Sequence, residues 1–300
     1  MTTTLLTNRT RSVAHLVLAA IVQSSLWVSA AVTTLLFYAG HILGLAVPPA
    51  VYVLGFASAM VVMNFDHLVD ARFEAIAGSP AQRTSTVAIL TVSASALLLF
   101  AMTLVNTPVR IVCVCYGLIG VFYGLPFFPI VWRRPVVWRR LKDIPGIKGW
   151  LVSGAIVFAT VALPLAASGR AFAPRTVIML AATLYLFIGS NAHMVDIRDI
   201  DHDRSVGNIT LPTLIGARKT RRLLLSANVV ALFLIAAAQF TGIVPLHPEI
   251  EIGMIVTMSY ILFLPTENAS FLYPLLIDGC IFVLPIAGRL HDILGGAARP

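Results

Sequence analysis

Nine apolar segments of about bilayer length recur along this chain, and they restrict its fold more than any other feature. A helix of about 20 apolar residues can cross the hydrocarbon core of a membrane. The 300 residues are 58% hydrophobic and only 11% charged, whereas soluble domains carry roughly 25% charged residues. The expected spans are about 14–40, 46–70, 86–106, 108–128, 149–168, 173–197, 221–243, 252–267 and 270–289.

These spans predict an all-α fold: a polytopic membrane protein built as a bundle of nine transmembrane helices. We expect one domain over residues 1–300, which begins with a short polar arm at 1–13. The first apolar stretch is too long for a cleavable signal peptide.

Two acidic trios lie where the second and sixth spans end. They are Asp66, Asp70 and Glu74, and Asp196, Asp199 and Asp203. Spacings of three and four residues place each trio on one face of a helix, while Asp201 faces away. Stacked carboxylates repel one another and are costly to desolvate unless a cation lies between them. The six carboxylates therefore predict a divalent-metal site at a membrane surface.

The basic residues place both trios on one side of the membrane. Of the 21 Lys and Arg residues, sixteen fall in the N-terminal arm and the loops after spans two, four and six. The positive-inside rule makes that side cytoplasmic. Carboxylates hold Mg²⁺, Mg²⁺ holds phosphate oxygens, and Lys and Arg neutralise the remaining charge. A diphosphate with an apolar tail would fit such a site, and we expect no nucleic-acid partner.

A plainer interpretation of the basic loops stays open. They could serve only to set topology and to contact anionic membrane lipid. That interpretation does not account for the acidic trios.

Three motifs in this chain resemble those of the UbiA superfamily of intramembrane prenyltransferases. The first reads DHLVDARFEAIAGSPAQR, from Asp66 to Arg83. The second pairs YGLP at Tyr123 with RLKDIPGIK, which starts at Arg140. The third, DIRDIDHDRSVGNITLPTLIG, starts at Asp196 and is long and specific. Two departures stand out, because Asp66 occupies a usual Asn position and Glu74 a usual Asp position.

The resemblance implies an enzyme that ionises a prenyl diphosphate with Mg²⁺ and transfers the prenyl chain to an aromatic or other small acceptor. Asp70, Asp199 and Tyr123 would be catalytic, with Asp70 and Asp199 also among the six metal ligands. The expected diphosphate-binding residues are Arg83, Arg140, Lys142, Lys148 and Arg204. The expected location is a bacterial inner membrane, with the active site at the cytoplasmic rim.

Several alternatives remain at this stage. The same residues could serve a terpene cyclase that uses prenyl diphosphate alone, and an inactive lipid-binding relative or a cation transporter is also conceivable. Transporters place their carboxylates near the bilayer midplane, often between internal repeats, whereas these lie at span ends. His193 is expected to make a helix–helix hydrogen bond rather than act in catalysis. Asp278, inside the ninth span, is an intramembrane acid of open role.

Overall fold

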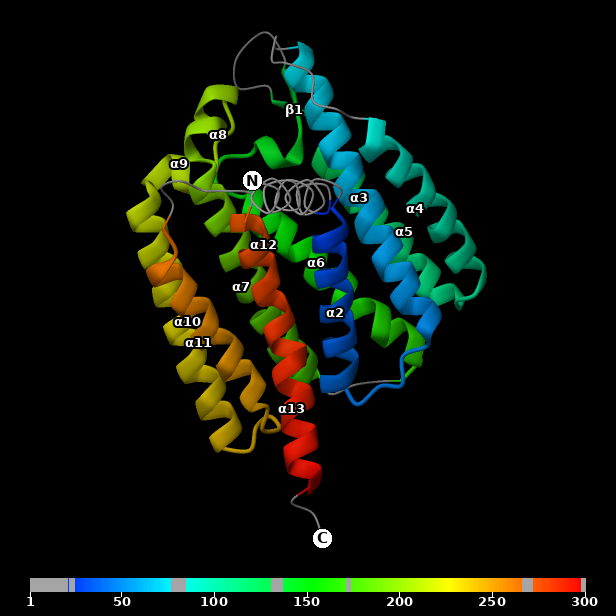
Figure 1. The fold of residues 1–300 in the computed structure, drawn as a ribbon, viewed down its shortest axis with the longest axis vertical. Helices are drawn as coiled ribbons and strands as arrows, with labels where there is room; N and C mark the ends of the chain where they lie inside the picture. The colour runs from blue at the N-terminus through cyan, green and yellow to red at the C-terminus, as the bar shows by residue number, and fades with distance from the viewer. Residues whose placement is uncertain are drawn as a thin grey trace, which may run out of the picture.

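The computed structural model is a bundle of long helices with one short strand pair (Figure 1). It describes residues 21, 25–76, 85–130, 137–170, 174–265 and 272–297. The long helices are α2 (Leu26–Ile42), α3 (Pro49–Ile76), α4 (Ser85–Thr103), α5 (Thr107–Gly124), α6 (Lys148–Ser168), α7 (Pro174–Arg198), α10 (Ala217–Phe240), α11 (Pro248–Phe263) and α13 (Val283–Ala297). The short elements are β1 (Phe128–Ile130), β2 (Val137–Arg139), η1 (Leu141–Asp143), α8 (Ile200–Val206), α9 (Leu211–Ile215), α12 (Leu272–Gly279) and η2 (Cys280–Phe282).

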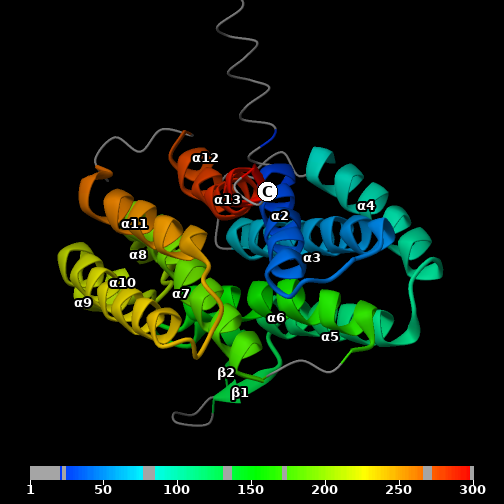
Figure 2. The ribbon, with the colours of Figure 1, turned by 90° about the horizontal axis from the view of Figure 1, so that it is seen from below.

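Helices α2, α3, α6 and α7 form the middle of the bundle. Helices α4 and α5 flank them on one side, and α10 and α11 flank them on the other (Figures 1 and 2). Helix α6 packs against α2, α5 and α7, so segments distant in sequence meet along its length. The main apolar core lies here, and its leucines Leu35, Leu180 and Leu184 are fully buried.

Several small polar side chains within the bundle bond to their own helices. The Thr160 hydroxyl donates to the Ile156 carbonyl at 2.9 Å, and the Ser153 hydroxyl donates to the Gly149 carbonyl at 2.7 Å. Because an apolar environment offers no water, such bonds let small polar residues stay buried without an unpaired donor.

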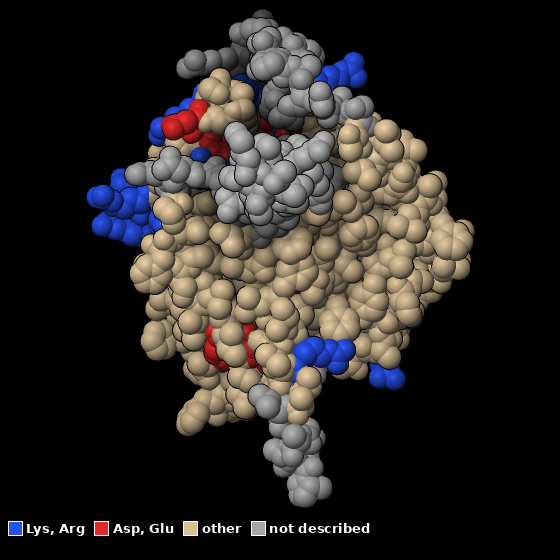
Figure 3. Space-filling view, viewed as in Figure 1, with Lys and Arg blue, Asp and Glu red and all other residues tan. Residues whose placement is uncertain are grey.

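The outer helices expose a broad apolar surface. In their candidate spans only 11% of the α4 residues and 17% of the α10 residues are buried. Large apolar side chains such as Phe100 on α4 and Phe233 on α10 are therefore open to the surroundings. Figure 3 shows this surface as an uncharged belt between charged groups at the two ends of the molecule. A belt of this kind is expected where lipid chains replace water.

The prediction of nine spans is not confirmed. Among the described residues, six helices are long and apolar enough to cross a membrane: α3, α4, α5, α6, α7 and α10. Helices α2 and α11 have only 17 and 16 residues. The last apolar segment is divided between α12 and α13 by the 3₁₀ turn η2.

Short elements gather at the end of the bundle reached by α3 and α7. Strands β1 and β2 pair antiparallel, with Phe128 opposite Arg139 and Ile130 opposite Val137. The all-α prediction missed this pair. After this strand pair the chain continues into η1, which lies beside α5 and α6. Helices α8 and α9 lie at the same end (Figure 1). The chain thus brings three predicted motifs to one rim.

Candidate active site

Two carboxylates of the first motif share one lysine. Asp66 and Asp70 lie one turn apart near the end of α3, and both accept hydrogen bonds from the Lys142 ammonium group. The Lys142 Nζ to Asp70 Oδ2 distance is 2.8 Å. The lysine side chain is only 5% exposed. A buried ammonium group needs such partners, because burial of an unpaired charge is strongly unfavourable.

The turn that carries Lys142 is held by its neighbours. The backbone N–H of Arg140 donates to Asp143 Oδ2 at 3.0 Å, and the Arg140 guanidinium lies 2.8 Å from Asp143 Oδ1. Arg140 also reaches Asp70 Oδ1 at 2.7 Å. Burial opposes the charge on Arg140, but its bonds and charge pairing with Asp143 and Asp70 outweigh burial and raise its pKa. Asp143 thus fixes the loop that presents two cations to α3.

A second pair of carboxylates faces Lys148, the first residue of α6. The Lys148 Nζ lies 3.5 Å from Asp196 Oδ1 and 3.8 Å from Asp203 Oδ1. The Asn208 amide also donates to Asp203 at 3.2 Å. Burial raises the pKa of Asp203, while Lys148 and Asn208 oppose that shift. Asp196 and Asp203 each keep a buried Oδ2 that has no hydrogen-bond partner within the described part of the chain.

Gly146 brings the two lysines to the same rim. It adopts a left-handed φ of 77°, which glycine reaches without steric cost. Its backbone N–H donates to the Ile209 carbonyl at 2.8 Å, which ties the loop between the two lysines to the segment after α8.

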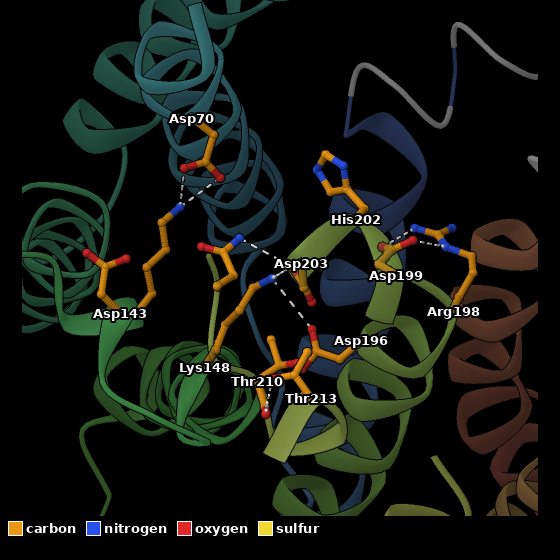
Figure 4. A network of polar contacts seen from close by, with 12 residues as sticks. Asp70, Asp143, Lys148, Asp196, Arg198, Asp199, His202, Asp203, Thr210 and Thr213 are labelled. Carbon is orange, nitrogen blue, oxygen red and sulfur yellow. Dashed lines mark hydrogen bonds and ion pairs between the residues drawn. The ribbon is translucent and has the colours of Figure 1, made fainter. Parts of the chain in front are cut away.

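Asp199 does not join the other two carboxylates of its motif. Helix α7 ends at Arg198, and α8 begins again at Ile200. The Arg198 guanidinium binds both Asp199 oxygens, at 2.6 Å and 2.5 Å. It lies over the Tyr273 ring at 5.8 Å, on the side toward α12 (Figure 4). The expectation of one continuous helical face is therefore wrong for Asp199, because the helix is interrupted at this residue.

The two carboxylate pairs face a common space. Lys148 interacts electrostatically with Asp66 and Asp70 as well as with its own partners. The Tyr123 ring lies beneath the first lysine, with Lys142 Nζ 5.2 Å from the ring centroid. Figure 4 shows Asp70 on one side of this space, opposite Lys148, Asp196 and Asp203. Four carboxylates and three cations from α3, the η1 loop, α6, α7 and α8 therefore meet at the rim.

Other predicted site residues lie apart or are not described. Arg204 points outward, with its side chain 57% exposed and 3.6 Å from Asp201. Glu74 lies in the last described turn of α3, and nothing is described of its side chain. Arg83 falls outside the described residues. Over the described ranges, no three His, Cys, Asp or Glu side chains are placed closely enough to share one metal ion.

Two residues of the site, Asp143 and Asn208, are not among those predicted from the sequence, although Asp143 lies in the RLKD string three residues after Arg140. The helix–helix hydrogen bond expected for His193 is absent, since neither of its ring nitrogens has a hydrogen-bond partner among the described residues. Its Nδ1 instead lies 3.5 Å from Asp196 Oδ2. That position follows from the i, i+3 spacing on α7, which was the available signal.

The fold and the rim define a class: a helical membrane protein with clustered carboxylates and cations at one end of an apolar bundle. A family comparison matches residues 53–270 to the UbiA prenyltransferase family. The chain belongs to this family. Together with the six helices among the described residues that are long and apolar enough to cross a membrane, this makes it an integral membrane protein. No curated protein matches the sequence significantly.

Solved structures show the same fold at low sequence identity. A UbiA homolog from Aeropyrum pernix K1, in apo form, is 16% identical and has a TM-score of 0.60, over 90% of this chain and 98% of that one. A UbiA homolog from Archaeoglobus fulgidus bound to GPP and Mg²⁺ is 13% identical with a TM-score of 0.60, over 91% and 98%. A structure of digeranylgeranylglyceryl phosphate synthase is 14% identical with a TM-score of 0.54, over 93% and 96%.

Proposed function

We propose that this chain is a Mg²⁺-dependent prenyltransferase that ionises a prenyl diphosphate and transfers the prenyl chain to an aromatic or other small acceptor. Its membership of the family supports this activity, and the homolog from Archaeoglobus fulgidus binds GPP and Mg²⁺. One observation carries the proposal: two carboxylate pairs, each with its own lysine, face one space at the end of an apolar bundle.

The described residues fit a divalent cation. Asp196 and Asp203 each bury a carboxylate oxygen that finds no hydrogen-bond partner among the residues described, and such atoms are costly unless something pairs with them. Oxygen ligands are those that Mg²⁺ prefers. We assign Mg²⁺ to each carboxylate pair separately, since Mg²⁺ is commonly held by one or two carboxylates together with water and substrate phosphate oxygens. Asp66 and Asp70 would bind one ion with Glu74, and Asp196 and Asp203 would bind another with Asp199, once Asp199 has left Arg198. When bound, Mg²⁺ supplies Lewis-acid stabilisation of the leaving diphosphate.

The cations of the rim would hold the diphosphate. Arg140, Lys142 and Lys148 already lie within the cluster, and ammonium and guanidinium groups form strong charge-assisted bonds to phosphate oxygens. Their present carboxylate partners keep them in place before substrate arrives. Arg83 and Arg204 are proposed to join from the rim loops.

The organic part of the substrate would lie below the rim, among apolar side chains. Exclusion of water there would protect an allylic cation from being quenched. The Tyr123 ring, which already lies beneath a lysine ammonium group, is placed to stabilise positive charge by its π face. The acceptor then attacks the cation and loses a proton. We further propose that the rim faces the cytoplasm in a bacterial inner membrane.

The test is turnover by the purified full chain in detergent. With Mg²⁺ and GPP, we expect release of pyrophosphate that stops in excess EDTA and returns with added Mg²⁺. Mass spectrometry with and without aromatic acceptors separates transfer from cyclisation, since a cyclase makes its product from GPP alone. Asp70→Ala provides the inactive control. Full turnover in excess EDTA, or no pyrophosphate release with any acceptor, would contradict the proposal.

A further inference from the structure

His193 is a fully buried histidine on α7, one helical turn before Asp196. Among the described residues, neither of its ring nitrogens has a hydrogen-bond partner. Its Nδ1 lies 3.5 Å from Asp196 Oδ2, an oxygen that is also buried and has no hydrogen-bond partner in the described part of the chain. A nitrogen that can donate and an oxygen that can accept therefore face each other slightly beyond the usual hydrogen-bond length.

Two glycines, Gly149 and Gly189, make room for the His193 ring and for the Trp150 ring beside it. A Cβ at Gly149 would lie 2.7 Å from the imidazole, and one at Gly189 would lie 2.6 Å from the Trp150 ring. Trp150 in turn packs edge-on against His193, with the ring centroids 4.6 Å apart. The first turn of α6 and the last turns of α7 thus enclose the imidazole and hold it under Asp196.

The two oxygens of Asp196 face different partners. Oδ1 points to Lys148 at 3.5 Å, on the side of the common space, and Oδ2 points to His193 at 3.5 Å. A hydrogen bond from His193 Nδ1–H to Oδ2 would fix the carboxylate plane and leave Oδ1 free for a cation. Apo sites commonly hold such bonds slightly long and tighten them when the ligand binds.

We propose that His193 is a positioning residue: its Nδ1–H orients Asp196 so that Oδ1 faces the divalent cation. This inference rests on the proposed function, because it needs a cation at the rim. Removing a residue that hydrogen-bonds to a metal ligand typically weakens metal binding by about 10- to 100-fold.

The test titrates the full chain in detergent with Mn²⁺ alone and follows the electron paramagnetic resonance signal of free Mn²⁺. His193→Leu keeps roughly the same side-chain volume and removes the donor, whereas His193→Asn keeps an N–H near the Nδ1 position. We expect about tenfold weaker Mn²⁺ binding for His193→Leu and near wild-type binding for His193→Asn. His67→Leu is the matched control, since His67 is exposed beside Asp66 and faces Ser25 at 3.4 Å.

Gly149→Ala gives a second route to the same answer if His193→Leu does not fold. The added Cβ must displace the imidazole while every carboxylate stays intact, so Mn²⁺ binding should weaken here too. Unchanged affinity in both variants overturns the inference, and so does an Asn variant as weak as the Leu variant. If the wild type binds no Mn²⁺ at all, the proposed function fails together with the inference. Wild-type binding with unaffected variants defeats the inference alone.

Discussion

Lys142 is the residue on which the first half of the site depends. It is buried, and it neutralises Asp66 and Asp70 at once. Substrate binding would therefore require the ammonium group to exchange carboxylate oxygens for phosphate oxygens. A lysine suits that exchange, because its charge is compact and its stem flexible.

Lys142→Ala should lower kcat/KM for prenyl diphosphate by roughly tenfold to a hundredfold. A hydrogen bond to a charged group is worth about 1.5–3 kcal/mol, and each 1.4 kcal/mol is a factor of about ten. Lys142→Arg should keep part of the activity. Lys219→Ala is the matched control, because Lys219 is exposed on α10. Steady-state kinetics decide the matter, and an unchanged kcat/KM for Lys142→Ala would move the diphosphate contact to Lys148 or Arg83.

Neighbouring aspartates of the second motif should differ sharply in importance. Asp203 is 2% exposed and faces Lys148, whereas the Asp201 side chain is 98% exposed. Asp203→Asn should cost roughly a hundredfold or more in kcat, because metal stabilisation of the transition state is worth several kcal/mol. Asp201→Asn should stay close to wild type. Equal losses in the two variants would mean that the assignment of Asp203 to the cation is wrong.

At the scale of elements, the long helices follow directly from the sequence, but their interruptions do not. Apolar length is a local property, so the predicted segment 149–168 agrees closely with α6. The break at Asp199 has a different origin. Adjacent side chains diverge on a regular helix, but the helix is interrupted at Asp199, where the Arg198 guanidinium binds both carboxylate oxygens. Residue spacing alone predicts that Asp199 faces the same way as Asp196 and Asp203. It carries no information on the competing ion pair between Asp199 and Arg198.

The sequence also does not show which basic residue pairs with which of the two carboxylate pairs. The five predicted diphosphate-binding residues are all basic residues near acidic motifs, and their positions in the sequence do not say which carboxylates each one pairs with. In the structure, Lys142 and Arg140 form ion pairs with carboxylates of α3, and Lys148 pairs with carboxylates of α7 and α8. The Arg204 side chain is exposed. These pairings depend on how the η1 loop folds between distant helices.

Arg221 joins two helices near the rim and gives a prediction about stability. From the first turns of α10, its guanidinium donates to the Ile261 carbonyl at 2.6 Å and to the Leu264 carbonyl. These bonds satisfy carbonyls that a helix end leaves unpaired. Arg221→Ala should destabilise the chain by about 1.5–3 kcal/mol, seen as a lower melting temperature in detergent. Arg222→Ala, an exposed neighbour, should leave the melting temperature unchanged, and a similar drop in both variants would exclude this role for Arg221.

At the scale of the whole molecule, the charges separate into two ends with an apolar belt between them (Figure 3). The carboxylates and cations of the site all lie at the end reached by α3, α7 and α8, and the basic residues at the start of α10 lie near them. This asymmetry was readable from the sequence, because apolar segments and basic loops are both local features. Which faces of the helices meet lipid and which meet one another depends on packing.

The orientation of this asymmetry in the membrane is the last prediction. Arg170 follows the end of α6 that lies far from the site, and Ser205 lies on α8 at the rim, one full crossing of α7 away. Both positions are exposed. In a chain whose three cysteines, Cys113, Cys115 and Cys280, have been replaced, a single cysteine at either position can be probed with a membrane-impermeant maleimide.

The positive-inside rule places the basic rim in the cytoplasm. Ser205→Cys should therefore react in inverted vesicles and stay protected in right-side-out vesicles, and Arg170→Cys should show the opposite pattern. Permeabilised vesicles, in which both cysteines should react, control for accessibility. Labelling of both positions from the same side would mean that α7 does not cross the membrane, and a full reversal would place the site on the outer face. Because α3, α6 and α7 all deliver site residues to one end, the side that Ser205→Cys reports is also the side from which diphosphate must enter.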